Sequence, residues 1–310
     1  MPEAAEPDLP RGVALAWGIA ADPQRGPKRE MSVERIVDAA VEIADAEGLG
    51  AVSMAAVAAR LGYTPMSLYR YVSAKEDLVL LMQEEATGLP PESIREQTGW
   101  RARLEAFYGA QVHRYLQHPW VLDVPISGSP TTPHSAAWMD AGLEALAETP
   151  LTHDERLAVV LVVTGHGNWT GRVLAGYARQ QRVTGEAEVD IARREDALYR
   201  ELITADAFPY LREAIDAGVF LDESDPFAFG VARTLDGVAA YIAERAAGAP
   251  SPPKPSWITD PDAEIAADKR FRDARRAVRD AERALRDARK VERQVARDAT
   301  ERARRAKPGA

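Results

Sequence analysis

The sequence predicts an all-α protein, and three observations support this fold class. Apolar residues recur every three to four positions along most of the chain, which is the spacing of one face of a helix. No segment shows the strict apolar–polar alternation of a half-buried strand. Serine, threonine or proline precedes several of the periodic stretches and glycine follows some of them, as helix starts and ends require.

Composition favours a globular protein of the cytoplasm. The 310 residues are 46% hydrophobic and 28% charged, with a formal net charge of −9. The absence of cysteine excludes a disulfide framework and thiolate metal sites. The start MPEAAEPDLPRG is acidic and unlike a signal peptide, and the apolar stretch VALAWGIAA is too short to span a membrane. We therefore expect a cytoplasmic protein without membrane association.

Four short helices are predicted over residues 31–88, after a flexible N-terminal arm at residues 1–30. Glycines at positions 48 and 62 are suited to end the first and second of these helices. The predicted N-caps are Ser32, Ser53, Thr64 (with Pro65 at the first helical position) and Ser73 (with Glu76 in a capping box).

The second and third of these helices, with a tight glycine turn between them, make a helix-turn-helix. On a helical wheel Leu68 and Val72 point inward, opposite the exposed face of the third helix. The N-terminal end of such a helix is the part that a recognition helix presents to base edges in the major groove. The outward and flanking residues are Thr64, Pro65, Met66, Ser67, Tyr69, Arg70 and Tyr71.

This part of an acidic chain contains no Asp or Glu from Gly48 to Lys75. A carboxylate near a phosphate is repelled, whereas each Lys or Arg there releases a counterion. The free N–H groups of the helices that begin at Ser53 and Ser73 can also hold phosphates. A second acid-free run, Arg156 to Gly185, is explained by burial, so the missing acid indicates DNA binding only together with a polar outward face.

Residues 32–82 resemble the DNA-binding domain of TetR-type transcriptional regulators. The resemblance is carried by SVERIVDAA and by AEGLGAVSMAAVAARLGYTPMSLYRYVSAKEDLVLLM. It implies that residues 64–67 face bases and that Tyr69, Tyr71 and Lys75 hold phosphates. Pro65 and Met66 stand where relatives carry polar base-contacting residues, which leaves apolar contact with thymine methyl groups as a means of readout.

Basic residues of the arm extend this surface in one of two interpretations. Arg25, Lys28 and Arg29 either reach a minor groove or phosphates, or form a solvated basic tail. With the arm included, the predicted DNA-binding residues are Lys28, Arg29, Ser53, Thr64, Pro65, Met66, Ser67, Tyr69, Arg70, Tyr71 and Lys75.

Residues 89–247 are predicted to form a larger helical domain. Helical patterns run over about 99–117, 132–148, 153–182, 186–203 and 226–246. The segments HPW and DPFAFGVARTLDGVAAYIAE resemble the effector-binding, dimer-forming domain of the tetracycline-repressor type. This resemblance implies a dimer that releases DNA when a small molecule binds.

A wide apolar stripe along the last of these helices predicts a homodimer contact, because such a stripe needs a partner. Two-fold symmetry would match a palindromic operator with half-sites about 34–36 Å apart. The predicted interface residues are Phe227, Val231, Leu235, Val238 and Ile242.

Aromatic residues and histidines gather in the same domain, which favours an apolar cavity for a small-molecule effector. His166 and Asn168 interrupt a long apolar run, and buried polar groups need partners. Core packing is the alternative explanation for each aromatic side chain. The predicted ligand-binding residues are Phe107, Tyr115, Trp120, Trp138, His166, Asn168 and Trp169.

A proline-rich linker at residues 248–264 precedes a charged helical tail at residues 265–307. Residues 268–307 hold 16 Lys/Arg and 8 Asp/Glu, a net charge of +8. Apolar residues repeat every seven positions along a seam that is lost near Glu292: Phe271, Val278 and Leu285, and Ala274, Ala281 and Ala288. Three interpretations stay open, namely a solvated single helix, pairing with another copy or with the acidic body, and nonspecific DNA attraction.

No catalytic set supports an enzyme. The segment GHGNWTG lacks the spacing of nucleotide-binding loops, and the five histidines never form the HExxH pattern, so no cofactor or metal site is predicted. The sequence therefore predicts a ligand-responsive dimeric repressor whose partners are an operator duplex and a small-molecule effector. Coupling is expected to run through the helix at residues 75–86. The alternative is a helical adaptor whose basic C-terminal helix recruits another protein.

Overall fold

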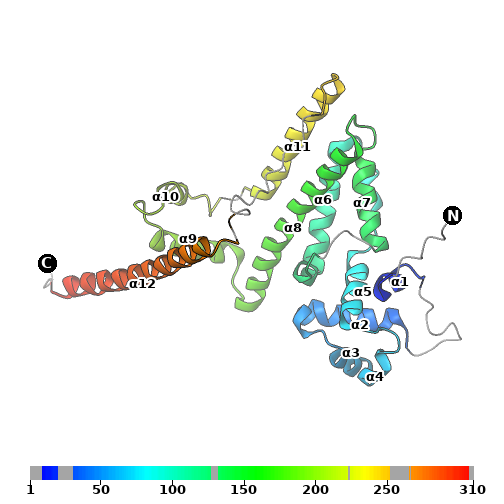
Figure 1. Cartoon of the computed structure of the whole chain (residues 1–310), viewed down its shortest axis with the longest axis horizontal. Coiled ribbons are helices and arrows are strands. Elements are labelled where there is room, and N and C mark those ends of the chain that lie inside the picture. Colours follow the sequence, from blue (N-terminus) through cyan, green and yellow to red (C-terminus); the bar gives the residue numbers. More distant parts are fainter. Residues whose placement is uncertain are drawn as a thin grey trace. The chain divides into compact units, whose positions relative to one another are not determined.

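The computed structural model of the chain describes residues 9–19, 31–126, 132–222, 224–251, 265 and 267–306. Within these residues the regular structure is helical throughout, which confirms the predicted all-α fold (Figure 1). The chain divides into two compact units, residues 1–250 and 251–310.

Residues 31–88, here called the N-terminal bundle, form the short helices that local signals predict. Ser32 and Ser53 accept hydrogen bonds from the backbone N–H three residues further on, and Gly62 ends its helix with a left-handed backbone (φ 76°). The elements are α2 (Val33–Glu47), the 3-10 helix η1 (Leu49–Ala51), α3 (Met54–Leu61), α4 (Pro65–Leu68) and α5 (Lys75–Thr87).

Two predicted caps differ from the expectation. Thr64 is the N-cap residue of α4, but its hydroxyl bonds to the Ser67 hydroxyl (3.0 Å) and not to the backbone. The capping box predicted at Ser73 is wrong, because α5 begins at Lys75 with Ala74 as its N-cap and without a side-chain cap. Ser73 precedes the N-cap position by one residue, so its hydroxyl is not placed to accept from the first free N–H groups.

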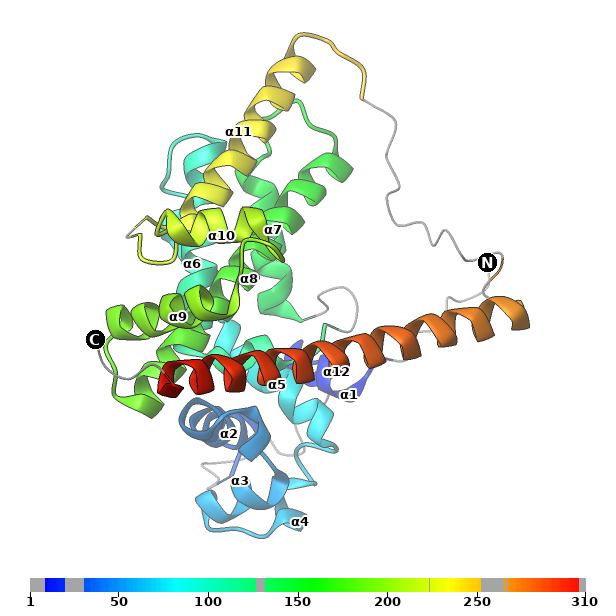
Figure 2. The same cartoon turned by 90° about the vertical axis from the view of Figure 1, so that its left-hand side faces the viewer.

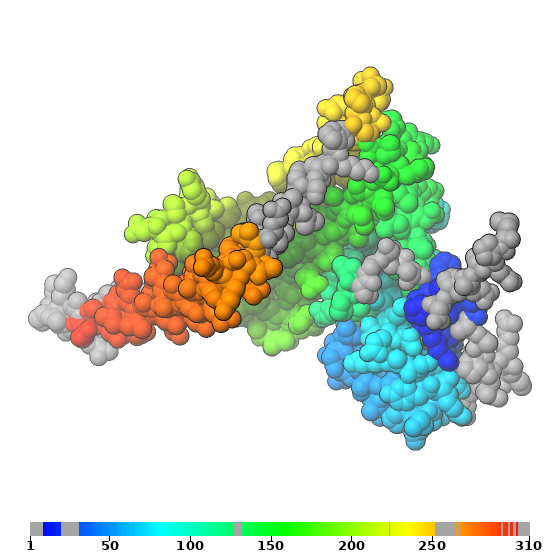
Figure 3. Space-filling view, viewed as in Figure 1, coloured from blue at the N-terminus to red at the C-terminus, as the bar shows by residue number. Residues whose placement is uncertain are grey.

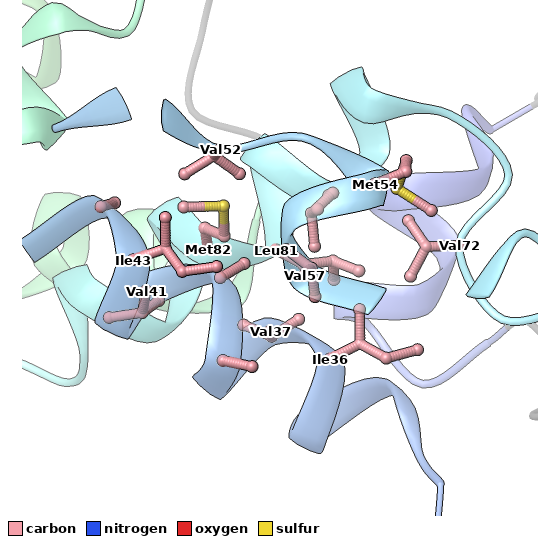
Figure 4. Packing of buried hydrophobic residues seen from close by; sticks show 14 of the residues in the cluster. Ile36, Val37, Val41, Ile43, Val52, Met54, Val57, Val72, Leu81 and Met82 are labelled. Carbon is pink, nitrogen blue, oxygen red and sulfur yellow. The ribbon is translucent and has the colours of Figure 1, made fainter. Parts of the chain in front are cut away.

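A hydrophobic core holds the N-terminal bundle together (Figure 4). Ile36, Val57, Leu68, Val72 and Met82 are each 0% exposed. Burying a side chain of this size contributes roughly 1.5–3 kcal/mol. Leu68 of α4 and Val72 just after the helix are both anchored in this core, so the core fixes the direction in which the rest of α4 faces.

Part of the segment predicted to be a flexible arm is folded. Arg11–Ala16 form α1, which packs on α5 and lies against the surface of the N-terminal bundle (Figure 3). The backbone N–H of Gly12 donates to Asp77 Oδ1 (2.9 Å), and a Cβ at Gly12 would lie 2.8 Å from the same oxygen. A helix this short is unstable alone, so tertiary packing, which periodicity does not reveal, accounts for it. Residues 20–30, with Lys28 and Arg29, lie outside the described residues.

Residues 89–247, here called the ligand domain, form the larger helical part of the first unit. Helices α6, α7, α8 and α11 run side by side (Figures 1 and 2). The five predicted helices are present, whereas α10 was not predicted because eight residues give too short a periodic pattern. The elements are η2 (Glu92–Ile94), α6 (Trp100–Gln117), η3 (Pro119–Asp123), α7 (Pro133–Ala145), α8 (His153–Thr184), α9 (Glu188–Leu202), α10 (Pro209–Asp216) and α11 (Pro226–Ala246).

The apolar stripe of α11 packs in part against its own chain, which corrects the predicted dimer contact for Val231 and Leu235 and leaves Phe227, Val238 and Ile242 as predictions. Val231 and Leu235 are buried in the core of the ligand domain, and Ile242 packs against that core. Phe227 and Val238 are half-buried. The partner that the stripe requires is therefore supplied in part within the subunit, because Val231 and Leu235 pack into the same core as residues of α6, α7 and α8.

The second unit contains one long helix, α12 (Lys269–Ala306). The Asp268 side chain caps it by accepting a hydrogen bond from the backbone N–H of Phe271 (2.8 Å). Residues 252–264, most of the predicted linker, lie outside the described residues.

Candidate nucleic-acid interface and ligand cavity

Helix α4 exposes the side opposite Leu68, and Leu68 itself is buried in the core of the N-terminal bundle. Met66 is 75% exposed and Tyr69 is 45% exposed, whereas Leu68 is 0% exposed. This is the orientation that the helical wheel predicts. The exposed or half-buried residues of this region, here called the α4 surface, are Ser53, Thr64, Pro65, Met66, Ser67, Tyr69, Arg70, Tyr71 and Lys75.

The charges around α4 suit an anionic partner. Arg70 and Lys75 are exposed and form no ion pair within the described part of the chain. Arg60 differs, because its guanidinium donates to Glu42 Oε2 at 3.0 and 2.6 Å. A phosphate that approaches α4 therefore meets Arg70 and Lys75, whose neutralisation of phosphates releases counterions.

A cavity of about 660 Å³ lies between α5 and helices α6, α7 and α8. This volume is within the range of about 300–1,000 Å³ that suits a drug-sized ligand. Val13 of α1 and Leu80 of α5 also contribute to its wall. Four of the predicted ligand-binding residues line it: Phe107, Tyr115, Trp138 and Asn168.

The polar groups of the wall are few and distinct. Gln111 is 8% exposed; its Nε2 donates to Thr164 Oγ1 (3.3 Å), and its Oε1 has no hydrogen-bond partner among the described residues. Burial raises the pKa of the Tyr115 hydroxyl, and a hydrogen bond with Asn168 offsets part of that rise. Arg114 is the one charged side chain among the described wall residues. The wall therefore suits a neutral or anionic ligand that donates a hydrogen bond to Gln111.

Three residues predicted to bind the ligand lie outside the cavity. Trp120 is buried in the core of the N-terminal bundle. His166 Nε2 bonds to the Phe227 carbonyl (3.0 Å) and so joins α8 to α11. Trp169 is 60% exposed on the outer side of α8. The composition of α8 identifies an aromatic-rich helix but not the side that faces the cavity, which tertiary packing decides.

Several wall residues were not predicted from the sequence. Gln111 carried a usable signal, because it follows Leu104 and Phe107 at helical spacing and places a polar group on a buried side of α6. Leu80 and Gln83 of α5 gave no such signal. Their presence in the wall depends on how α5 packs against α6 and α7.

Hydrogen bonds join the end of α5 to α7, beside the cavity. The Trp138 indole donates to the Gly88 carbonyl (2.9 Å). The backbone N–H of His134 donates to Glu84 Oε1 (2.7 Å), and His134 Nδ1 lies 2.7 Å from the Glu84 carbonyl. Gly88 has a positive φ of 57°, and a Cβ there would lie 3.1 Å from the Arg114 guanidinium. Helix α5 thus belongs both to the N-terminal bundle and to the cavity wall.

A second junction joins α2 to η3. Asp45 Oδ1 accepts from the Trp120 indole N–H (2.8 Å) and lies 2.8 Å from His118 Nδ1. The Arg172 guanidinium donates to the Leu122 carbonyl and so ties η3 to α8. The sequence prediction named α5 as the route between the two domains, and η3 is an additional contact that it did not include.

The outer side of α8 and α11 carries large apolar side chains. Their exposed fractions lie between 39% and 65%. Exposed apolar side chains of this kind are candidates for an interaction site. The residues of this outer α8–α11 face are Leu157, Leu161, Val162 and Trp169 of α8 and Phe229 of α11.

Other site classes find no support within the described residues. No group of three or more His, Cys, Asp or Glu side chains in that part of the chain could hold a metal ion. No helix there is long and apolar enough to cross a membrane.

Two family models match the chain at the regions that carry these features. The model for bacterial regulatory proteins of the tetR family matches residues 36–82, which include α3, α4 and the turn between them. The model for the tetracyclin repressor-like C-terminal domain matches residues 92–242, which include most of the cavity wall.

Two relatives are HTH-type transcriptional regulators. The HTH-type transcriptional repressor DrrR1 of Streptomyces coeruleorubidus is 33% identical over 240 residues, which cover 77% of this chain and 88% of the relative. An HTH-type transcriptional regulator of Saccharopolyspora erythraea is 28% identical over 155 residues, covering 50% of this chain and 66% of the relative.

Solved structures show the same fold. ActR from Streptomyces coelicolor without ligand superposes with a TM-score of 0.52 at 23% identity, covering 70% of this chain and 99% of ActR. ActR in complex with actinorhodin superposes with a TM-score of 0.53 at 20% identity, covering 71% of this chain and 97% of ActR.

Proposed function

Because this chain belongs to the TetR family of bacterial regulatory proteins and is a transcriptional regulator rather than an enzyme, we propose that it is a dimeric repressor that leaves a palindromic operator when an effector enters the cavity. The observation that carries the proposal is the orientation of α4, with Met66 75% exposed above a fully buried Leu68. A protein of this kind works in the cytoplasm, where its operator is.

The α4 surface reads the operator in this proposal. Thr64–Ser67 face base edges, with Met66 against thymine methyl groups. Tyr69, Tyr71 and Lys75 hold phosphates, and Arg70 adds charge beside them. Lys28 and Arg29, outside the described residues, are proposed to contact the duplex from the N-terminal arm.

The effector is proposed to be a planar aromatic molecule with hydrogen-bonding oxygens and no positive charge. Aromatic side chains at Phe107, Tyr115 and Trp138 supply flat apolar walls. Gln111 Oε1 would accept a hydrogen bond from the effector, and Arg114 disfavours a cation. Actinorhodin, which ActR binds in a structure of the same fold, is the first compound to test.

Effector binding would act on DNA through α5. Leu80 and Gln83 of α5 lie in the cavity wall, and Gly88 at its end accepts from Trp138. An effector that fits only when α5 is displaced favours the state in which the two recognition helices are wrongly spaced. Operator affinity then falls by the factor by which bound DNA weakens effector binding.

The dimer contact is proposed at the outer α8–α11 face. Val231 and Leu235, predicted for this role from the sequence, are buried within the subunit. Leu161, Trp169 and Phe229 remain exposed and would be covered by the same face of a second copy. Leu161→Asp should therefore give monomers in light scattering, with Leu198→Asp on α9, exposed to a similar extent, as the matched control.

Selection of bound fragments from random duplex tests the DNA-binding part. A two-fold symmetric sequence with half-sites about 34–36 Å apart is expected. Absence of both a steep salt dependence and a sequence preference would favour the alternative, a helical adaptor whose basic C-terminal helix recruits another protein.

Titration of the operator complex with actinorhodin tests the effector class. Release of the duplex, followed by gel shift, is expected at micromolar effector, and the release should weaken in Phe107→Ala. A cationic planar dye serves as the control compound in a binding titration of the DNA-free protein, because such dyes also bind duplex DNA, and Arg114 should exclude it. Equal affinity of the DNA-free protein for both compounds would contradict the assigned charge preference.

A further inference from the structure

Helix α12 carries an apolar seam that the described part of its own unit leaves uncovered. Val278, Leu285 and Val295 are 57%, 51% and 55% exposed. With Phe271 they lie along one side of a helix whose other positions are mostly charged. A soluble helix exposes a continuous seam of this kind where another helix covers it.

We propose that α12 pairs in an antiparallel coiled coil with α12 of a second copy of the chain. Large residues alternate with alanines along the seam: Phe271, Ala274, Val278, Ala281, Leu285 and Ala288. In a parallel pair each seam residue faces its own copy, so phenylalanine meets phenylalanine and alanine meets alanine. The antiparallel pair instead brings a large residue against an alanine in every layer, which keeps the helix separation constant.

One antiparallel register achieves this volume match over six layers. It places Phe271 against Ala288 of the second copy, Leu285 against Ala274, and Val278 against Ala281. Two-fold symmetry gives the other three layers, which contain the same residue pairs with the two copies exchanged. Glu292 takes the next seam position beyond this stretch, and Val295 resumes the apolar pattern.

The flanking charges select the same register independently. Arg275 and Glu282 each follow a seam alanine by one residue, and this register sets Arg275 of each copy beside Glu282 of the other. The same register sets Asp268 of each copy beside Arg289 of the other. A parallel pair would instead set Glu282 and Arg289 beside Ala277 and Ala284, which cannot form ion pairs, and Arg275 beside Arg270, which repels it.

The alanines make the pair close-packed but small in buried area. Helix axes approach to about 8 Å where side chains at the contact are small. Little apolar surface is buried per turn, so the pair needs a high local concentration of its partner. If the ligand domain is dimeric, as proposed above, the tether supplies an effective concentration of the order of millimolar.

Cysteine cross-linking in the full chain tests the orientation, because the native sequence contains no cysteine. The double variant Ala274→Cys/Leu285→Cys should oxidise to a covalent dimer. Each single variant should not, because a residue and its copy are then eleven positions, about 16 Å, apart along the axis, and a disulfide requires Cα atoms within about 7 Å. The matched control Arg276→Cys/Asp287→Cys has the same spacing on the outer side of α12 and should stay monomeric on a non-reducing gel.

The outcomes separate the possible arrangements. Cross-linking by either single variant would show a parallel pair, and absence of cross-linking in all variants would show an unpaired helix; either result overturns the proposal. Where no cross-link forms, light scattering on the same samples reports whether the ligand domain is dimeric. A dimer without an α12 cross-link would therefore reject this inference alone, whereas a monomer would reject the dimer of the proposed function.

A charge exchange tests the register. In the double-cysteine chain, Arg275→Glu or Glu282→Arg should slow cross-linking about fivefold, since two exposed ion pairs become repulsive contacts. The combined exchange should restore the rate. Residues 275 and 282 are two turns apart within one helix, so restoration requires the second copy; failure to restore would contradict the assigned register.

Discussion

The two hydrophobic cores of the first unit are built differently. The core of the N-terminal bundle is filled below α4, where Leu68 and Val72 are fully buried, and it reaches the cavity at Ala86 of α5. The core of the ligand domain includes Phe107, Trp138 and Val160, which also border a cavity of about 660 Å³. A surface that reads DNA requires fixed geometry, whereas a domain that senses a ligand requires room. The difference predicts that mutations in the two cores affect stability and ligand response unequally.

Removal of Leu68 should have the largest effect. Leu68→Ala leaves a cavity beneath α4 and should lower the free energy of unfolding by about 2–5 kcal/mol. Operator binding should fall with it, because α4 loses its anchor. Urea denaturation and hydrogen exchange of α2–α5 amides measure the change. Met66→Ala on the exposed side should shift stability by no more than about 0.5 kcal/mol, and a similar loss in both variants would contradict the filled core below α4.

Asp45 should come next, since it lies where the core of the N-terminal bundle meets the ligand domain. Asp45→Ala leaves the buried Trp120 N–H without its acceptor and removes the contact to His118. We expect a loss of about 1–3 kcal/mol in the free energy of unfolding. Asp38→Ala on the exposed side of α2 is the matched control. Equal stability of the two variants would show that the η3 junction is not structural.

Gln111 should affect the effector response rather than stability. Gln111→Leu removes a buried oxygen that has no partner among the described residues, together with the long hydrogen bond from Nε2 to Thr164 Oγ1 (3.3 Å); the two effects oppose each other, so stability should stay nearly unchanged. Release of the operator by an effector should need about tenfold more compound if that oxygen accepts a hydrogen bond from it. Thermal unfolding and gel-shift titration give the two values. A destabilised variant with unchanged effector response would assign Gln111 to the core alone.

Tyr69 should give the smallest effect. Tyr69→Phe removes one hydroxyl from the α4 surface, and operator affinity should fall several-fold without a change in stability. Tyr210→Phe, at an 85% exposed tyrosine of α10, is the control. Equal affinity of both variants in a gel-shift titration would exclude the phosphate contact proposed for Tyr69.

The orientation of α4 could be predicted from the sequence because it depends on local spacing. Leu68 and Val72 are four residues apart, and both are buried although α4 ends at Leu68, because the turn after it keeps the Val72 N–H bonded to the Leu68 carbonyl (3.0 Å). The Ser73 cap was wrong for a local reason as well, since the helix begins one residue later than the pattern indicates. Boundaries shift by one or two residues where the side-chain signal is weak.

The cavity could be predicted only in part, because its wall depends on tertiary packing. Phe107, Tyr115, Trp138 and Asn168 line it, but the equally aromatic Trp169 is on the other side of α8. The stripe of α11 has the same ambiguity. Periodicity shows that Val231 and Leu235 need a partner, but not whether that partner is the same subunit or a second copy.

The arrangement at Gly88 has an evolutionary consequence. Its backbone conformation favours glycine, and the space that a side chain would need is occupied by the Arg114 guanidinium. The two positions are therefore not free to drift separately. In an alignment of orthologous regulators, sequences without glycine at position 88 should also have replaced the arginine at 114 by a shorter residue. This covariation would mark the place where the end of α5 meets the cavity wall.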